Sequence, residues 1–276
     1  MDLKENLSVA GRTHTGRVRE HNEDYMAKNL DIGLVVLADG MGGYKSGEVA
    51  SELAISTVVA ELEKRIPLLT PGELDPQTGY TYESLAVREA ITQANAEIFK
   101  KGSENPDCQG MGTTLVLALF YNNQITVAHV GDSRMYRFRD SKLEQITIDH
   151  TFLQELVDRG YYTQEEAEAS LNRNLVTRAL GIQPTTAVDI REDLVIPEDI
   201  FLLCSDGLTD MVSDQEISNI ISEFHDNIDR LAENLVECAN ANGGRDNISV
   251  LLARPNVTLP QNKTWNAKIK EIFERN

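Results

Sequence analysis

Three apolar segments of this chain each lead into an aspartate beside a glycine, and this repeated pattern limits what the chain can fold into. The pairs are Asp39-Gly40, Gly131-Asp132 and Asp206-Gly207, and a fourth aspartate, Asp246, precedes a further apolar run. Short runs rich in Val, Ile and Leu are typical of buried strands, and Asp beside Gly is typical of a turn after a strand. A turn explains any one pair. Several acids at strand ends predict a shared site if those ends converge.

The apolar runs predict short strands separated by helices. The predicted strands span residues 32–38, 114–121, 125–130, 134–138, 143–147, 200–204 and 248–253. Asn122-Asn123 favours a hairpin, which the runs at 134–138 and 143–147 are expected to extend as one antiparallel meander. Apolar residues at helical spacing predict helices over 48–66, 82–101 and 226–242, and capping-box patterns begin at Thr163 and Ser213.

The strands come in clusters between helix pairs, without strict alternation of strand and helix. This order predicts an α+β fold with antiparallel sheets covered by helices, and it argues against a doubly wound parallel sheet. No repeat or Pro/Gly/Ser linker divides the chain, so we expect one folded domain over 1–253 and a short tail over 254–276. The tail carries five basic and two acidic side chains, which leaves −21 on residues 1–253.

Charge and cysteine content exclude several classes of protein. A net charge of −18 over 276 residues disfavours nucleic acid and anionic membranes as main partners, although a local basic groove stays compatible with it. The three cysteines lack CxxC spacing, which excludes a disulfide scaffold and a thiolate zinc site. Without a signal-like apolar start, we expect a cytoplasmic protein.

The glycine-rich motifs do not match known consensus sequences when compared residue by residue. The segment 40–47 is rich in glycine. A Walker loop needs glycine where Tyr44 stands, and a dinucleotide fingerprint needs glycine or alanine where Lys45 stands.

Two histidines are candidates for a role. His129 lies in an apolar strand and is interpreted as a core residue, whereas His150 is either a loop contact or functional. Clustered carboxylates repel unless a cation bridges them, and carboxylates without Cys or His select Mg²⁺, Mn²⁺ or Ca²⁺.

Six motifs in a fixed order carry a family resemblance. They are REHNED at 19–24, DGMGG at 39–43, GTT at 112–114, GDSR at 131–134, SDG at 205–207 and GRDN at 244–247. With these motifs the chain resembles the metal-dependent protein phosphatases, the type 2C serine/threonine phosphatase family, in its bacterial form, over about residues 8–253. The resemblance implies a sandwich of two antiparallel β-sheets flanked by helices, with a binuclear Mn²⁺ or Mg²⁺ site at one end.

The resemblance also implies a role for each acid. Asp39 would bridge both metals, with Glu23 and the Gly40 carbonyl on one of them and Asp206 and Asp246 on the other. Asp24 would hydrogen-bond metal-bound waters. Asp132, with Asp206 and Asp210, matches a weaker third metal site, and Arg19 matches the arginine that binds phosphate, for which a bidentate guanidinium is apt.

The implied reaction is hydrolysis of phosphoserine and phosphothreonine by direct attack of a metal-bridging hydroxide. Cys204 is interpreted as a core residue and not as a nucleophile. Phosphorylated proteins, among them serine/threonine kinases and their substrates, are the expected partners, and a monomer is the expected state. The segment 149–181 resembles the flap beside the site in bacterial members; substrate selection and a plain surface helix are equally compatible with it.

Two functions of other classes compete with this interpretation. A catalytically weak or dead relative that binds phosphoproteins is disfavoured because Glu23, Asp39, Asp206 and Asp246 are all present. A two-metal nuclease or nucleotide hydrolase uses similar chemistry, but the order of the motifs and the acidic surface argue against it.

Two positions differ from the family pattern. Animal members have histidine right after the first Asp-Gly, and many bacterial ones have it three residues later; this chain has Met41 and Tyr44 there. No histidine can therefore be assigned as the general acid, and a metal-bound water or Tyr44 is the hypothesis, with Tyr44 in contact with substrate.

The Tyr44→Phe variant tests that hypothesis. If Tyr44 protonates the leaving alcohol, turnover should fall at least about tenfold on a phosphothreonine peptide and less than about twofold on p-nitrophenyl phosphate, whose leaving group needs little protonation. Steady-state kinetics on the two substrates measure this, and an equal loss on both would discard the role.

Overall fold

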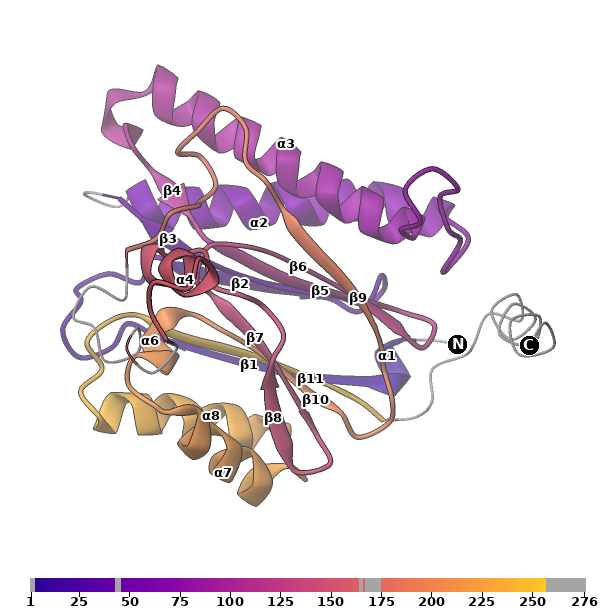
Figure 1. Ribbon diagram of the computed structural model, residues 1–276, viewed down its shortest axis with the longest axis vertical. Coiled ribbons are helices and arrows are strands. Elements are labelled where there is room, and N and C mark those ends of the chain that lie inside the picture. The colour runs from indigo at the N-terminus through magenta and orange to yellow at the C-terminus, as the bar shows by residue number, and fades with distance from the viewer. Residues whose placement is uncertain (1–2, 43–45, 164–165, 167–174, 257–276) are drawn as a thin grey trace.

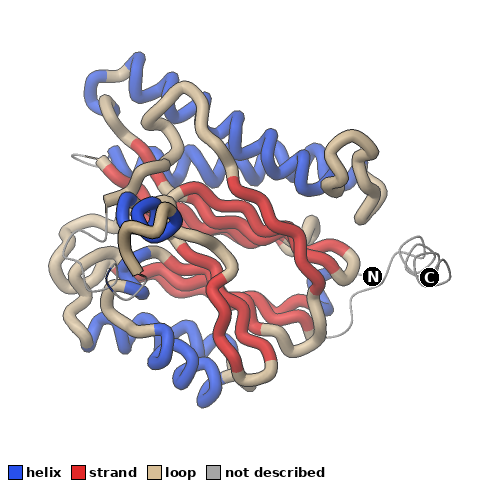
Figure 2. Tube along the Cα trace, in the orientation of Figure 1, coloured by secondary structure: helices blue, strands red, loops and turns tan. Residues whose placement is uncertain are grey.

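Two β-sheets face each other in the centre of the molecule, and helices cover their outer faces (Figures 1 and 2). The computed structural model describes residues 3–42, 46–163, 166 and 175–256. All strand pairs within these residues are antiparallel. The predicted α+β sandwich of two antiparallel sheets is therefore confirmed.

The first sheet has the strand order β1-β11-β10-β7-β8, and the second has β2-β3-β5-β6-β9 with β4 paired to β3. The strands of the first sheet are β1 (Leu7–His14), β11 (Ile248–Pro255), β10 (Ile200–Cys204), β7 (Arg134–Arg139) and β8 (Lys142–Gln145). Those of the second are β2 (Asp24–Asn29), β3 (Leu34–Met41), β4 (Gly112–Thr113), β5 (Leu115–Tyr121), β6 (Gln124–Val130) and β9 (Asp189–Leu194). Strand β11 continues two residues beyond the predicted domain boundary at 253.

The helices form two outer layers and one end of the molecule. Along the second sheet lie α2 (Ser46–Arg65) and α3 (Tyr82–Glu104), and along the first lie α7 (Asp214–Phe224) and α8 (Ile228–Ala241) (Figure 1). The shorter helices are α1 (Leu3–Asn6), α4 (Phe152–Asp158), α6 (Asp206–Thr209) and the 3₁₀ turns Ile66–Leu68 and Pro106–Cys108. Figure 1 shows α4 and α6 at the end of the sandwich opposite α1.

Local sequence explains where the helices begin and end. The capping box predicted at Ser213 is present at the start of α7, with Glu216 as its partner. The pattern at Thr163 also makes its two reciprocal bonds with Glu166, but the rest of the predicted helix 163–170 lies outside the described residues. Helix α8 ends before Gly243 and Gly244, whose φ angles are 133° and 52°.

The central strands are apolar at consecutive positions because both of their faces are buried. In β3, Leu34 and Val36 pack toward α2 and α3, while Val35 and Leu37 pack between the two sheets. Strand β10 alternates in the same way. At the sheet interface Phe120 of β5 meets Phe201 of β10 edge to face, with ring centroids 5.5 Å apart.

One prediction about strand pairing is wrong. The runs at 134–138 and 143–147 form β7 and β8, but these strands do not extend the β5–β6 hairpin, because β7 pairs with β10 in the other sheet. The chain crosses between the sheets at Gly131, whose φ of 107° a side chain would strain. The hairpin itself is confirmed, with Asn122 at a φ of 49°.

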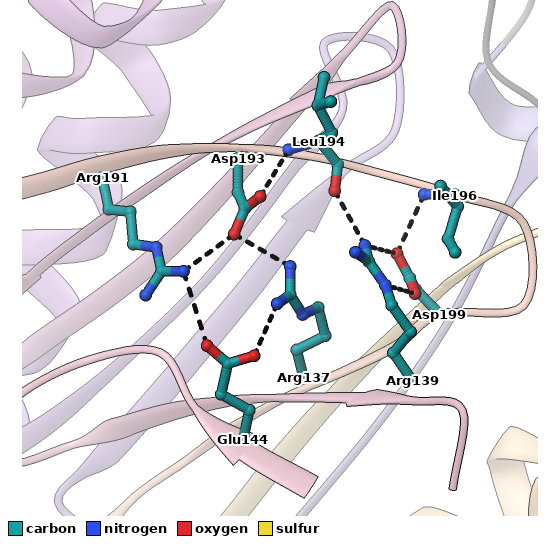
Figure 3. Close-up of polar contacts among 8 residues, drawn as sticks. All are labelled: Arg137, Arg139, Glu144, Arg191, Asp193, Leu194, Ile196 and Asp199. Carbon is teal, nitrogen blue, oxygen red and sulfur yellow. Dashed lines mark hydrogen bonds and ion pairs between the residues drawn. The ribbon is translucent and has the colours of Figure 1, made fainter. Parts of the chain in front are cut away.

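A ring of four ion-paired side chains joins the two sheets along one edge (Figure 3). Arg137 of β7 contacts Glu144 of β8 at 2.6 Å and Asp193 of β9 at 2.9 Å. Arg191 of β9 reaches the same two carboxylates at 3.6 and 3.1 Å. Beside the ring, Asp199 accepts two bonds from Arg139, at 2.7 and 2.6 Å. The edge strands β8 and β9 belong to different sheets, so the ring closes the sandwich there.

None of the helices in the described part of the chain combines the length and the hydropathy that crossing a bilayer requires.

The two arginines of the ring should differ in their contribution to stability. Arg137 is 12% exposed and Arg191 is 46% exposed, although they share the same partners. We expect Arg137→Gln to lower the free energy of unfolding by about 1–2 kcal/mol and Arg191→Gln by less than about 1 kcal/mol, because solvent screens the exposed pair. Urea denaturation measures both; equal losses would contradict the burial argument.

Candidate active site

Asp24 and Asp39 lie directly opposite each other on neighbouring strands, β2 and β3. Asp39 and Gly40 lie inside β3, which continues to Met41, so the first Asp-Gly pair is not the turn that its sequence suggests. Thr113 and Thr114 of the GTT motif hold this strand end. Thr114 Oγ1 accepts from the Asp39 backbone N–H at 3.1 Å, and Thr113 Oγ1 donates to the Asp39 carbonyl at 2.8 Å.

Glycines allow three segments to approach one another around Glu23. A Cβ at Gly40 would lie 2.1 Å from the Gly47 carbonyl oxygen, and one at Gly47 would lie 2.6 Å from Glu23 Oε1. Any side chain at either position would collide with backbone or with Glu23. Gly40 and Gly47 therefore allow the start of α2 to lie against the Glu23 carboxylate.

Asp206 and Asp246 come from the first sheet. Asp206 is the first residue of α6 and is separated from β10 by Ser205, and Asp246 is separated from β11 by Asn247. A Cβ at Gly207 would lie 1.9 Å from the Asn247 carbonyl oxygen, so this glycine is what lets the two segments touch. Arg19 Nη2 donates to Asp246 Oδ2 at 2.7 Å.

Asn247 connects the REHNED segment to the last strand. Its side-chain Nδ2 donates to the carbonyls of Thr15 and His21 at 3.0 and 2.8 Å, and its Oδ1 accepts from the Glu23 backbone N–H at 2.8 Å. One buried side chain therefore fixes the backbone that carries Arg19, Glu23 and Asp24.

Asp132 and Asp210 complete the set of predicted acids. Asp132 is 8% exposed and follows the crossing at Gly131. Asp210 caps α6, with its N–H bonded to the Asp206 carbonyl at 2.8 Å. Burial raises the pKa of Asp132 to about 6, and the charges of Asp149 and Asp210 add to this. The structure therefore brings Asp132, Asp206 and Asp210 together.

The acids influence one another's ionisation. Burial, followed by the charges of Asp24, Asp206, Asp132 and Asp246, raises the pKa of Asp39 well above its usual value. The pKa of Asp206 is raised well above its usual value by burial and then by Asp132, Asp210 and Asp246. The pKa of Asp24 rises to about 6, mainly through burial. Strand ends from both sheets thus converge at one end of the sandwich.

Comparisons with known proteins agree with this geometry. The family model described as Protein phosphatase 2C matches residues 10–252. Serine/threonine phosphatase stp of Listeria monocytogenes is 37% identical over 253 residues, which cover 90% of this chain and 95% of that protein. The crystal structure of Mycobacterium tuberculosis serine/threonine phosphatase PstP/Ppp matches with a TM-score of 0.79 at 37% identity, covering 91% of this chain and 99% of that one.

The chain belongs to the protein phosphatase 2C family. It is a metal-dependent serine/threonine protein phosphatase, so the family and the enzyme class predicted from the six motifs are confirmed. A crystal structure of the catalytic domain of PstP in complex with two manganese ions matches with a TM-score of 0.74 at 38% identity, covering 91% of this chain and 99% of that one.

The acids of this phosphatase fit divalent cations. Every candidate side-chain ligand is a carboxylate, which is the donor that Mg²⁺ and Mn²⁺ prefer. Asp24 Oδ2 accepts from Ser205 Oγ at 2.9 Å, but its buried Oδ1 has no hydrogen-bond partner. Carboxylates that raise one another's pKa lose this repulsion when a cation lies among them.

Several residues that support the site were not singled out from the sequence. Asn247, Thr114 and Ser205 occur within the six motifs, but only the structure shows their bonds to the segments that carry the acids. For Asn247 and Ser205 the signal was a polar side chain next to an acid, whereas Thr114 has no acid beside it in the sequence. Tyr44 lies outside the described residues.

The raised pKa values of Asp24 and Asp132 predict how stability changes with pH. Both are about 6, above the roughly 3.9 of an exposed aspartate, so the folded state binds these two protons more tightly than the unfolded state. In EDTA, lowering the pH from 7 to 5 should raise the contribution of each residue to the free energy of unfolding by about 1 kcal/mol. With saturating Mn²⁺ the sign should reverse, because protons compete with the cation.

Urea denaturation at pH 5, 6, 7 and 8, with EDTA or with Mn²⁺, measures this effect. The Asp132→Asn variant is the control, because it removes one of the titrating groups and should flatten the pH dependence in EDTA. An unchanged slope in that variant would contradict the assignment.

Proposed function

We propose that this phosphatase hydrolyses phosphoserine and phosphothreonine in proteins by direct attack of water on phosphorus at the carboxylate cluster. The observation that carries the proposal is the burial of Asp39 and Asp206 among acids from both sheets, with the pKa of each raised by burial and by the charges of neighbouring carboxylates. Repulsion of this kind is compatible with a stable fold when cations occupy the cluster.

Two Mn²⁺ or Mg²⁺ ions would be held by the acids at the meeting of the strand ends. Asp39 would contribute to both, with Glu23 and the Gly40 carbonyl for one and Asp206 and Asp246 for the other. Asp132, Asp206 and Asp210 would hold a third, weaker ion. When bound, such cations supply a water of lowered pKa as nucleophile and offset the charge of the phosphoryl oxygens.

Arg19 would orient the phosphate. Its side chain is 54% exposed and its bond to Asp246 uses one of the five N–H groups of the guanidinium, which is a planar donor suited to phosphate. The hydrogen bond and charge of Asp246 raise the pKa of Arg19, so it stays positive at every working pH. Asp24, held by Ser205, would hydrogen-bond the attacking water.

A covalent cysteine intermediate is not part of the proposal. Cys204 is fully buried, and burial raises the pKa of its thiol to about 12, which removes the thiolate that attack requires. The three cysteines of the chain are free, which suits a reducing compartment, so we place the enzyme and its substrates in the cytoplasm.

The proposed partners are phosphorylated proteins, among them serine/threonine kinases and their substrates. The proposed catalytic unit is the predicted domain 1–253, as a monomer, together with residues 254 and 255, which complete β11; the remaining residues would form an appended tail. The support for phosphoproteins over nucleic acid is the net charge of −18, because a strongly acidic surface repels a polyanion.

The Asp39→Asn variant tests the mechanism. We expect turnover of a phosphothreonine peptide with Mn²⁺ to fall at least about 10³-fold, since the residue shared by both cations is lost. Phosphate release, measured for the wild type with Mn²⁺ and with EDTA, gives the reference, and a DNA substrate is assayed in parallel.

The outcomes separate the competing functions. Phosphate release that requires Mn²⁺ and disappears in Asp39→Asn supports the proposal. A near-normal rate in that variant would overturn the mechanism. An inactive wild type that still binds phosphopeptide would indicate a binding module, and cleavage of DNA would indicate a nuclease.

A further inference from the structure

His150 holds both backbone polar groups of Gly131, the residue before Asp132. The His150 N–H donates to the Gly131 carbonyl at 3.0 Å, and the Gly131 N–H donates to His150 Nδ1 at 3.0 Å. The His150 side chain is 6% exposed, so water competes little with these bonds. The direction of the chain at Asp132 therefore depends on a ring from another segment.

The other ring nitrogen of His150 contacts two residues from beyond α4. Its Nε2 lies 3.2 Å from Asp189 Oδ2 and 3.0 Å from Arg178 Nη1, and Arg178 Nη1 donates to Asp189 Oδ1 at 2.7 Å. The His150 carbonyl also accepts from the Thr177 N–H at 2.8 Å. These contacts join the two ends of the segment 149–181 to the start of β9.

The bonds fix the tautomer of His150. Because Nδ1 accepts from the Gly131 N–H, the proton of the neutral ring is on Nε2, where it donates to Asp189 Oδ2. Burial, reinforced by the stacked ring of His129 4.5 Å away, lowers the pKa of His150 to about 4, which keeps the ring neutral.

The same tautomer excludes a metal at this cluster. Potential ligand atoms of His129, His150 and Asp189 lie within 4.8 Å of one another. A cation on His150 Nε2 would require a lone pair on both ring nitrogens at once, and it would also face the positive charge of Arg178. The cluster of His129, His150 and Asp189 is better explained as a hydrogen-bonded support for the backbone at Gly131.

The position of Gly131 affects two parts of the site. It precedes Asp132 directly, and a Cβ on Gly131 would lie 2.7 Å from Thr114 Cβ, so the two residues are in tight contact. Thr114 in turn holds the Asp39 backbone and bonds Ser133 Oγ at 2.7 Å. A shift of Gly131 therefore displaces Asp132 first and Thr114 second.

We propose that His150, oriented by Asp189, which Arg178 holds in place, is the positioning residue for Asp132 and sets the affinity of the cation site that Asp132 shares with Asp206. The proposal rests on the proposed function, because it takes Asp132 to be a cation ligand. Supports of this kind typically change metal affinity about 10–100-fold when removed.

Two substitutions of His150 separate its two bonds. In His150→Asn the amide oxygen takes the place of Nδ1 and keeps an acceptor for the Gly131 N–H. In His150→Gln the longer side chain reaches toward Asp189 and loses that acceptor. Asp189→Asn leaves His150 in place but removes the charge that orients it.

The control is Asp193→Asn, four residues along the same strand. Like Asp189, Asp193 has two cationic or imidazole partners, here Arg137 and Arg191, but it belongs to the ring that closes the sheet edge (Figure 3). In the register of the two strands, Asp193 lies opposite Ile125 of β6, whereas Asp189 lies opposite His129. Loss of this carboxylate costs stability without touching Gly131.

Isothermal titration of the metal-free enzyme with Mn²⁺ is the measurement. The Mn²⁺-binding step that is present in the wild type and lost in Asp132→Asn belongs to the site that Asp132 holds. We expect His150→Gln to weaken that step at least about fivefold, Asp189→Asn about two- to fivefold, and both His150→Asn and Asp193→Asn less than about twofold.

Each outcome decides the proposal. It fails if His150→Gln changes the melting temperature but not the Asp132-dependent step, or if Asn and Gln at 150 weaken it equally. It also fails if Asp132→Asn loses no step. If His150→Gln does not fold, an unchanged step in Asp189→Asn overturns it and a weakened step supports it. A wild type that binds no Mn²⁺ at all refutes the proposed function itself, separately from His150.

Discussion

Mutual repulsion of buried carboxylates is the constraint on which the rest of this structure depends. Asp39 lies in β3 of the second sheet and Asp206 follows β10 of the first; both are buried among other carboxylates, and the charge of Asp206 raises the pKa of Asp39. A fold that brings these charges together must hold their backbones firmly, because the acids themselves would separate. The close approaches at Gly40 and Gly207 and the three bonds of Asn247 supply that rigidity. The sandwich therefore keeps the carboxylates close together against their mutual repulsion.

Much of the fold could be predicted from the sequence because its central strands are buried on both faces. Strands β3, β5, β6, β10 and β11 appear as continuous apolar runs for that reason. Four strands were missed. Strands β1, β2 and β9 are edge strands with partly exposed, polar side chains, so their pattern resembles a loop, and β4 has only two residues. The sheet to which β7 belongs could not be predicted, because pairing with β10 is a contact across more than 60 residues.

The candidate acids were found by the family motifs, and the structure brings them to one end of the sandwich. Their supports were not found, because a hydrogen bond such as that from Glu23 to Asn247 joins residues 224 positions apart. His150 shows the same limit. Its sequence context allowed a loop contact or a function, and only the two bonds to Gly131 connect it to Asp132.

The place of β11 between β1 and β10 has a consequence for how the enzyme is made. Among the strands of the described residues, β11 is the last to be synthesised, so the eight residues of β1 have no partner strand in their sheet until β11 leaves the ribosome. Asp246 arrives with that strand. A chain that stops before Asp246 lacks one carboxylate of the cluster, so we expect catalytic activity only after the first sheet is complete.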